Sequence, residues 1–438
     1  MSRAYIPMTA ADREAMLATI GVSSVDELFA DVPAAALKSD LSTLPPPLSE
    51  QELMAEMCAL SEENVPAGNL AFFRGGGAYR RFTPSVVDEV IRRGEFLTSY
   101  TPYQAEASQG TLQAAFEFQS VIATLYGMEV ANAGLYDGAS ALAEACLMAC
   151  RVTGRDRIAV ADSVNPRYLR VVRAYADPQG LGVDVVPLEA PSLTDEHACL
   201  ALQSPDYYGH IVLRDDGPAK LCHDNGSLLV VSADPMSLAL LRPPGELGAD
   251  IAVGEGQSLG LPLQFGGPYV GLFTTQMQHI RQMPGRIVGQ TTDLDGQRAF
   301  VLTLQAREQH IRRERASSNI CTSEQLIALA VVAYVSLMGR VGLAKVARLG
   351  YDRAHYAAAA IDALPSWSLV FPDEPFFQEF AVRCPRSVAE VNAALREQGI
   401  VGGLDVSTES EARMVLCVTE TNTRAEIDRL VAALRSIG

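Results

Sequence analysis

The sequence predicts an α/β protein with a mostly parallel sheet, a small C-terminal α+β lobe and an N-terminal helical arm. Short apolar segments that read as strands alternate with helical stretches, at 157–161, 183–187, 228–231 and 251–253. This alternation is typical of a parallel sheet that helices cover on both faces. The pattern changes near residue 340, and residues before 65 look helical with polar flanks. We therefore expect an arm at 1–65, a large α/β domain at 66–340 and a small α+β domain at 341–438.

The arm contains one capped helix and one stiff joint. Ser24–Phe29 has the residue order of a helix start, and Pro45–Pro47 favours an extended conformation. An arm of this kind is expected to wrap on a neighbouring subunit.

Two further helices are expected in the large domain, besides a shorter one at 167–175. From Thr111 apolar residues recur at three-and-four spacing until Gly127, which is a typical helix stop. The longest apolar run, Leu326–Gly339, has 14 residues. A membrane span needs about 20, so a buried helix is expected, with Thr322–Gln325 as its capping box.

The C-terminal lobe is expected to combine strands with amphipathic helices. The segments 377–382 and 414–418 read as strands, and 387–398 and 423–436 read as helices. This mixture predicts an α+β lobe that follows the α/β domain.

Composition excludes several classes of partner. The chain of 438 residues is 48% hydrophobic and 20% charged, which is typical of a globular protein, and its formal net charge is -17. Such acidity disfavours nucleic acid and anionic membrane surfaces. The eight cysteines are scattered and are interpreted as reduced core residues, and no signal peptide is evident, so a cytoplasmic location is expected. The six histidines lack metal-ligand spacing, so no metal site is predicted.

A polar loop, Ser99–Gly110, precedes the long helix. It is rich in hydroxyl and amide groups and contains Pro102, and loops of this composition commonly bind ligands. Tyr100, Tyr103 and Gln104 are its candidate functional residues. The alternative is a simple helix entry, in which Ser108 or Gln109 provides the cap and the tyrosines are half-buried.

Two segments could receive an anionic or cationic group, or could merely cap helices. Tyr136–Ser140 leads directly into a helical stretch, whose free N–H groups could bind a phosphate. Asp137 or Ser140 as an ordinary N-cap explains the same pattern. Asp234 follows a strand and could pair with a pyridinium nitrogen, although Asp followed by Pro also starts helices well.

The segment before the apolar helix is highly charged and then polar. Glu308 and Arg312 are spaced as an i,i+4 pair on a solvated helix face. Ser318 and Asn319 follow, and these polar residues just before a core helix could face a pocket.

Five motifs, taken in order, resemble one known family. They are Phe73–Tyr79, Ser99–Gly110, Tyr136–Ala139, Leu241–Asp250 and Ser318–Thr322. Together they resemble the P-protein of the glycine cleavage system over nearly the whole chain. The resemblance implies the fold type I aminotransferase-like architecture and an enzyme that uses pyridoxal phosphate on a lysine.

The lysine of that family has no counterpart in this chain. In the catalytic half of the family it lies 11 residues before the proline of a Gly-Gly-Pro turn; here that turn is Gly266–Pro268, and the count reaches Gln257. An amide is not nucleophilic, so this position cannot bind the cofactor covalently. The chain has only Lys38, Lys220 and Lys345, and none is placed to replace it.

The resemblance therefore implies a lysine-free alpha subunit of a split P-protein. A lysine-bearing beta subunit would hold pyridoxal phosphate covalently, in a heterotetramer with two of each subunit. Glycine would lose its carboxylate as CO2, and the aminomethyl group would pass to the lipoyl group of H-protein. Tyr100, Tyr103 and Gln104 would line one wall of the shared pocket, and Ser318 and Asn319 would lie near the cofactor.

Two other functions remain open at this point. One is an autonomous pyridoxal-phosphate decarboxylase or aminotransferase, which needs a cofactor lysine. The other is a structural or regulatory pseudoenzyme that only stabilises its partner.

Overall fold

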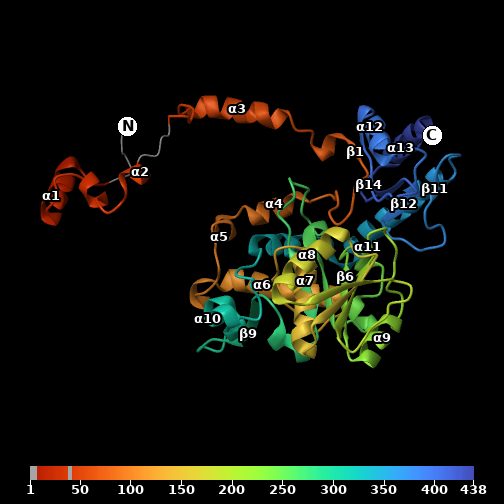
Figure 1. The fold of residues 1–438 in the computed structure, drawn as a ribbon, viewed down its shortest axis with the longest axis horizontal. Helices are drawn as coiled ribbons and strands as arrows, with labels where there is room; N and C mark the ends of the chain where they lie inside the picture. Colours follow the sequence, from red (N-terminus) through yellow and green to blue (C-terminus); the bar gives the residue numbers. More distant parts are fainter. Residues whose placement is uncertain (1–6, 38–41) are drawn as a thin grey trace. The chain divides into compact units, whose positions relative to one another are not determined.

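The chain divides into two compact units in the computed structural model, Met1–Val65 and Pro66–Gly438. The structure describes residues 7–37 and 42–438, so Lys38 lies outside the described residues. Figure 1 shows the elements of each unit along the chain.

Within the first unit, the described elements are short helices whose side chains are all at least partly accessible. They are α1 (Ala10–Ile20), α2 (Ala34–Leu37) and α3 (Glu50–Glu62), and none of them has a buried residue. Thr9 and Ser49 begin α1 and α3 with capping boxes, which satisfy free N–H groups at the helix starts. The capped helix expected at 24–29 is only a 3-10 turn, Asp26–Phe29, without a side-chain cap at its N-cap residue.

A seven-stranded sheet forms the centre of the second unit. Its order is β2-β8-β7-β6-β5-β3-β4, and β8 is antiparallel to both of its neighbours while the other pairs are parallel. The bounds are β2 (Val130–Ala131), β3 (Arg157–Ala161), β4 (Gly182–Val186), β5 (His197–Ser204), β6 (Leu228–Ala233), β7 (Ile251–Glu255) and β8 (Gly271–Thr275).

The central strands are buried at successive residues, because both faces of the sheet are covered. Neighbouring side chains of a strand point to opposite faces, so the unbroken burial of β6 after its first residue requires cover on each face. The strands predicted at 157–161, 183–187, 228–231 and 251–253 correspond to β3, β4, β6 and β7. The α/β fold class is thus confirmed.

Several helices precede the long apolar helix in this unit. They are α4 (Ser85–Ile91), α5 (Gly94–Leu97), α6 (Gln109–Tyr126), α7 (Gly138–Thr153), α8 (Pro166–Ala176), α9 (Gly217–Asn225) and α10 (Gln309–Arg312). α7 packs against β5, β6, β7 and β8, and α8 packs against α7. The expected long helix is α6, and it ends at Gly127, whose φ of 64° is a left-handed conformation that favours glycine. A hairpin of β9 (Ile287–Thr292) and β10 (Arg298–Thr303) packs beside α6.

The apolar helix α11 (Gln325–Asp362) is longer than the predicted 14-residue run. Gly339 has non-helical dihedral angles and divides it into two segments. By length and composition α11 could cross a bilayer, but many of its side chains are buried inside the protein, as in a core helix. The expected capping box was wrong: Glu324 is the N-cap and makes no side-chain cap, and Thr322 instead bonds to Arg286.

The C-terminal lobe contains a four-stranded antiparallel sheet with two helices. Its strands are β11 (Ser368–Leu369), β12 (Glu379–Arg383), β15 (Arg413–Cys417) and β14 (Leu404–Asp405), in that order, and its helices are α12 (Val388–Glu397) and α13 (Arg424–Ile437). A second core, separate from that of the large sheet, joins this lobe to the end of α11. β1 (Ala71–Phe72) pairs in parallel with β13 (Ile400–Val401) and so attaches the segment after the arm to this lobe.

The interpretation of the cysteines as reduced core residues holds for only some of them. All eight are free thiols, and five are buried. Cys58 and Cys321 are exposed, so they are not core residues.

Candidate functional site

Gln257, at the position where the resemblance calls for a lysine, is fully enclosed. Its side chain has 0% exposure. The amide oxygen accepts the N–H of Tyr79 at 2.8 Å, and the amide nitrogen donates to the carbonyls of Tyr79 at 2.9 Å and Leu261 at 2.8 Å. Every polar atom of this side chain is thus used within the chain, and the side chain ties the segment around Tyr79 to the end of β7.

Glu255, the last residue of β7, occupies the start of helix α7. Its carboxylate accepts the N–H groups of Gly138 at 2.9 Å, Gln257 at 3.0 Å and Val270 at 3.2 Å. Burial raises the pKa of Glu255 to about 8, although the three N–H donors favour the ionised form. Asp137 provides the N-cap, because its carboxylate accepts the Ser140 N–H at 2.7 Å. Asp137 is therefore the ordinary N-cap of the alternative interpretation, and the Gly138 N–H is already bonded to Glu255 within the chain.

Asp234, the candidate partner for a pyridinium nitrogen, is bound internally. One carboxylate oxygen accepts the N–H of Met236 at 3.0 Å and the hydroxyl of Ser258 at 3.3 Å, and the other accepts the amide of Gln378 at 3.1 Å. Burial raises the pKa of Asp234, and Arg81 opposes that rise. The alternative, Asp234 as a helix N-cap, is also not met: the bond to Met236 closes a turn, and Met236 is the N-cap of the short 3-10 helix that follows.

The glycine loop at 75–77 is anchored by Glu379 of the C-terminal lobe. This carboxylate accepts the N–H of Gly76 at 2.6 Å and the hydroxyl of Tyr79 at 2.8 Å. Burial raises the pKa of Glu379 to about 7. A Cβ on Gly75 would lie 2.1 Å from the same carboxylate, so the loop needs a residue without a side chain here.

Together these contacts leave the candidate groups for holding pyridoxal phosphate bonded within the chain. The residues of this chain do not fit pyridoxal phosphate. Gln257 cannot bond to it covalently, Glu255 takes the anion position of α7, and Asp234 is engaged by Gln378. Lys220 is no substitute, because it is exposed and paired with Asp216 at 2.9 Å.

The candidate residues of the polar loop lie on the surface. Tyr100 is 76% exposed, Tyr103 is about half-buried at 54% exposure, and Gln104 is exposed as well. Ser108 provides no side-chain cap for α6, whereas Gln109 bonds to the main chain of Phe300 in β10. The helix-entry interpretation therefore holds in part: Ser108 is the N-cap residue of α6 but makes no side-chain bond, and Tyr103 is half-buried whereas Tyr100 is not.

Arg286, which the sequence reading missed, connects this loop to the polar segment before α11. It is 4% exposed and donates to the Tyr103 hydroxyl at 3.4 Å, the Thr322 hydroxyl at 3.1 Å and the Cys321 carbonyl at 2.8 Å. Its guanidinium also lies over the Tyr103 ring, 5.5 Å from the centroid. Arg286 stands alone between a proline-glycine pair and a strand, and no charge pattern in the sequence marks it.

Glu308 is the counter-charge of this arginine, and its predicted solvated position was wrong. It is 7% exposed and lies 3.7 Å from the Nε atom of Arg286. His310 is at the same distance from Glu308 and contacts the Tyr103 ring edge-on, with centroids 5.8 Å apart. Burial raises the pKa of Glu308, while Arg286 lowers it.

Ser318 and Asn319 differ in whether their side chains are free to bind another molecule. The Ser318 hydroxyl donates to Glu144 of α7 at 2.7 Å and accepts the Ile320 N–H, so it holds its own loop in place. Asn319 is exposed. The structure thus brings Tyr103 together with the 318–322 segment through Arg286, and it leaves Tyr100 and Gln104 free of that cluster.

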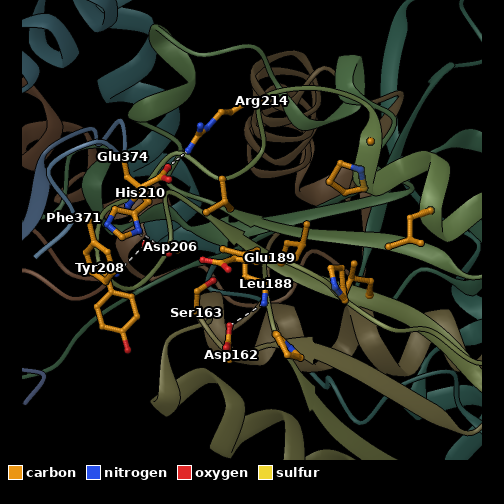
Figure 2. A pocket seen from close by; sticks show the side chains of 18 residues that line it. Asp162, Ser163, Leu188, Glu189, Asp206, Tyr208, His210, Arg214, Phe371 and Glu374 are labelled. Carbon is orange, nitrogen blue, oxygen red and sulfur yellow. Dashed lines mark hydrogen bonds and ion pairs between the residues drawn. The ribbon is translucent and has the colours of Figure 1, made fainter. Parts of the chain in front are cut away.

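A large cavity lies elsewhere, and none of the predicted site residues lines it. It measures about 890 Å³ and lies at the carboxyl ends of β3 and β4, under part of the C-terminal lobe. Figure 2 shows its acidic lining and the pair between Arg214 and Glu374 at its side. Among residues 7–37 and 42–438, no cluster of three or more side chains is suited to hold a metal ion.

Comparisons with known proteins define the class and then the family. A solved mutant of C-DES with glycine covalently linked to its PLP cofactor has a TM-score of 0.61 at 17% identity, over 84% of this chain and 97% of the other. The fold is thus that of fold type I pyridoxal-phosphate-dependent enzymes. The glycine cleavage system P-protein family model matches residues 3–434, and the chain belongs to this family.

Close relatives extend over almost the whole chain. The probable glycine dehydrogenase (decarboxylating) subunit 1 of Thermomicrobium roseum is 49% identical, over 98% of this chain and 99% of the relative. The crystal structure of glycine decarboxylase (P-protein) of the glycine cleavage system, in inhibitor-bound form, is 43% identical with a TM-score of 0.92 and covers 100% of both chains. The resemblance predicted from the five motifs is confirmed.

Proposed function

We propose that this chain is the lysine-free subunit of a two-subunit glycine dehydrogenase (decarboxylating), whose partner subunit binds pyridoxal phosphate covalently. The observation that supports this most strongly is Gln257, which is buried and fully hydrogen-bonded at the lysine position. The name of the close relatives, subunit 1, also fits an enzyme made of two different chains.

The proposed reaction divides the work between the two subunits. Pyridoxal phosphate, held by the partner, supplies the electron sink for the loss of CO2 from glycine. The aminomethyl group then passes to the lipoyl group of H-protein. This chain contributes the wall that faces the partner.

The surface around Tyr100, Tyr103 and Gln104 is the proposed wall. All three side chains are exposed and present hydroxyl or amide groups that can donate and accept hydrogen bonds. Arg286 fixes Tyr103 from behind, so its hydroxyl is positioned before a partner binds. Asn319 is proposed to reach toward the partner's cofactor, while Ser318 keeps the segment in place through Glu144.

Assembly with a partner is supported by the composition of helix α3. Leu53, Met57 and Leu60 recur at helical spacing, and each is about half exposed. An apolar stripe left in water is costly, and obligate interfaces are broad and apolar. We propose a heterotetramer with two copies of each subunit. The free thiols favour a reducing compartment, and the cytoplasm is proposed.

Reconstitution tests the proposal directly. The chain is purified alone and together with a lysine-bearing partner, and glycine–CO2 exchange is measured with lipoylated H-protein. Exchange is expected only with both subunits present. Borohydride reduction and peptide mapping should place the pyridoxyl group on the partner; a pyridoxyl group on Lys220 would refute the assignment and favour an autonomous enzyme.

A second candidate function is a scaffold that only stabilises its partner. The filled interior around Gln257 favours it, since a chain that has lost its cofactor pocket needs no chemistry of its own. Sedimentation and activity separate the two functions. A scaffold should preserve the mass of the complex, and substitutions on the tyrosine surface should leave the exchange rate unchanged.

A further inference from the structure

At the start of helix α7, main-chain N–H groups form an arrangement that could bind an oxyanion, and a side chain of the same chain already occupies it. Three main-chain N–H groups converge there, and they come from separate segments: Gly138 at the helix start, Gln257 after β7, and Val270 before β8. All three donate to one carboxylate, that of Glu255. Convergent N–H donors at a helix start are the arrangement that proteins use for phosphate groups.

Close packing fixes the carboxylate in this position. A Cβ on Gly138 would lie 2.9 Å from the Cβ of Glu255 and 2.8 Å from the Tyr168 hydroxyl. A Cβ on Gly256, the next residue, would lie 2.5 Å from a methyl group of Val270. Both positions therefore need glycine, and the backbone around Glu255 is closely packed.

We propose that Glu255 is a built-in substitute for a phosphate group, which keeps phosphate esters out of this subunit. The carboxyl group of Glu255 takes the three N–H donors that a phosphate would need, so these donors are not available to a second oxyanion. Asp137, the N-cap of the same helix, places a carboxylate beside them, which would repel an anion. Phosphate-bearing cofactor is thereby excluded from this subunit by an occupied site as well as by the lack of a lysine.

This inference concerns the chain alone and does not depend on the proposed function. Glu255→Ala removes the occupant and leaves the three N–H donors and the helix start exposed to a small anion. The E255A chain should bind inorganic phosphate at least tenfold more tightly than the wild type, because the emptied site is already arranged for an oxyanion.

The experiment measures phosphate binding by calorimetry and by the thermal midpoint of unfolding, in a buffer of low anion content. A ligand that binds only the folded chain raises that midpoint, so E255A should gain stability with phosphate and the wild type should not. Two variants serve as controls. Glu255→Gln keeps the site filled by a side chain of the same size, and Glu144→Ala removes a buried carboxylate further along α7; neither should gain phosphate binding.

The location of the bound anion completes the test. A crystal structure of E255A with phosphate should place it against the Gly138 N–H. Wild-type binding as tight as that of E255A, or phosphate bound to E255A at another place, would overturn the proposal. If E255A does not fold, Glu255→Ser offers a smaller side chain that also empties most of the site, and folded E255S without phosphate binding would equally contradict it.

Discussion

The interior around Gln257 and the surface around Tyr103 are built in opposite ways, although both belong to motifs that the P-protein resemblance singled out. In the interior, Gln257, Glu255 and Asp234 all have partners within the chain. At the surface, hydroxyl and amide groups stay exposed while a buried arginine holds one of them. The difference teaches that polar side chains inside this chain are bonded within it, whereas those of the polar loop remain exposed to solvent.

The largest effect is expected for Gln257→Lys, which tests whether the interior around Gln257 has room for another group. If the cavity is full, the new ammonium is buried without a counter-charge and the three hydrogen bonds of Gln257 are lost. We expect the free energy of unfolding to fall by about 4 kcal/mol, with no absorbance band from bound pyridoxal phosphate. Chemical denaturation and absorbance spectra measure both. Gln264→Lys, at an exposed position, is the matched control, and a stable Q257K chain that binds the cofactor would show that the cavity is open.

The same interior should make stability depend on pH through Glu379. Its pKa is raised from 4.5 to about 7, so the folded state binds the proton more tightly than the unfolded state. The stabilisation is complete below pH 4.5 and is lost as pH rises to about 7, by about 3 kcal/mol at most. Glu255, raised to about 8, acts in the same direction. Denaturation from pH 5 to 8 should show a smaller slope for Glu379→Gln; an equal slope would mean that another group is responsible.

The support beneath the tyrosine surface can be broken at Arg286. Lysine carries the charge but lacks the forked donors, so Arg286→Lys cannot contact Thr322, Cys321 and Tyr103 together. We expect a loss of about 2 kcal/mol in the free energy of unfolding, since hydrogen bonds to charged groups are worth about 1.5–3 kcal/mol each. Arg298→Lys, exposed over the ring of Phe300, should change stability by less than about 0.5 kcal/mol. Equal losses in the free energy of unfolding for the two variants would mean that the forked contacts of Arg286 do not stabilise the loop.

The smallest change in stability is expected at the tyrosine surface, where the effect should appear in the rate. Tyr103→Phe removes one hydroxyl with a long contact to Arg286, so stability should change by less than about 1 kcal/mol. If the hydroxyl acts in the shared active site, glycine–CO2 exchange by the reconstituted complex should fall about tenfold, which corresponds to about 1.4 kcal/mol. Tyr100→Phe and Gln104→Ala belong to the same series.

Tyr356→Phe is the matched control for this series, because it deletes a hydroxyl that bonds to Asp428 on a remote helix pair. The mass of the complex is measured alongside the rate for each variant. Normal exchange by all three surface variants, in intact complexes, would favour the scaffold function.

Local sequence rules predicted the regular elements well and the tertiary contacts poorly. Gly127 ended α6 as expected, because a left-handed residue after an apolar periodic stretch is a local property. The counting from the Gly-Gly-Pro turn reached Gln257, which the structure places at the end of β7. In contrast, β5 was missed, although it is the central neighbour of β3 and β6.

The misses at the candidate site share one cause, which is pairing between distant residues. Glu308 looked like half of a solvated i,i+4 pair, yet Arg286 draws it into the interior. Thr322 looked like a cap, yet it serves the same arginine. The carboxylate of Glu255 lies 117 positions from the N–H that it accepts at Gly138. Such partners are fixed by the fold, and no spacing rule within one segment can reveal them.

The pairing of β1 with β13 has a consequence for the order in which this protein can fold during synthesis. The Asn422 side chain donates to the Phe72 carbonyl across 350 positions, close to where Ala71 pairs with Ile400. At about 5–20 residues per second, a ribosome needs roughly 20–70 s to make the chain between these two ends. During that time Phe73, which belongs to the core of the C-terminal lobe, waits without its partners. The C-terminal lobe therefore includes the segment 71–73, which is made long before the rest of the lobe. Because these contacts join residues far apart in the sequence, we expect the lobe to finish folding only after the chain is released from the ribosome.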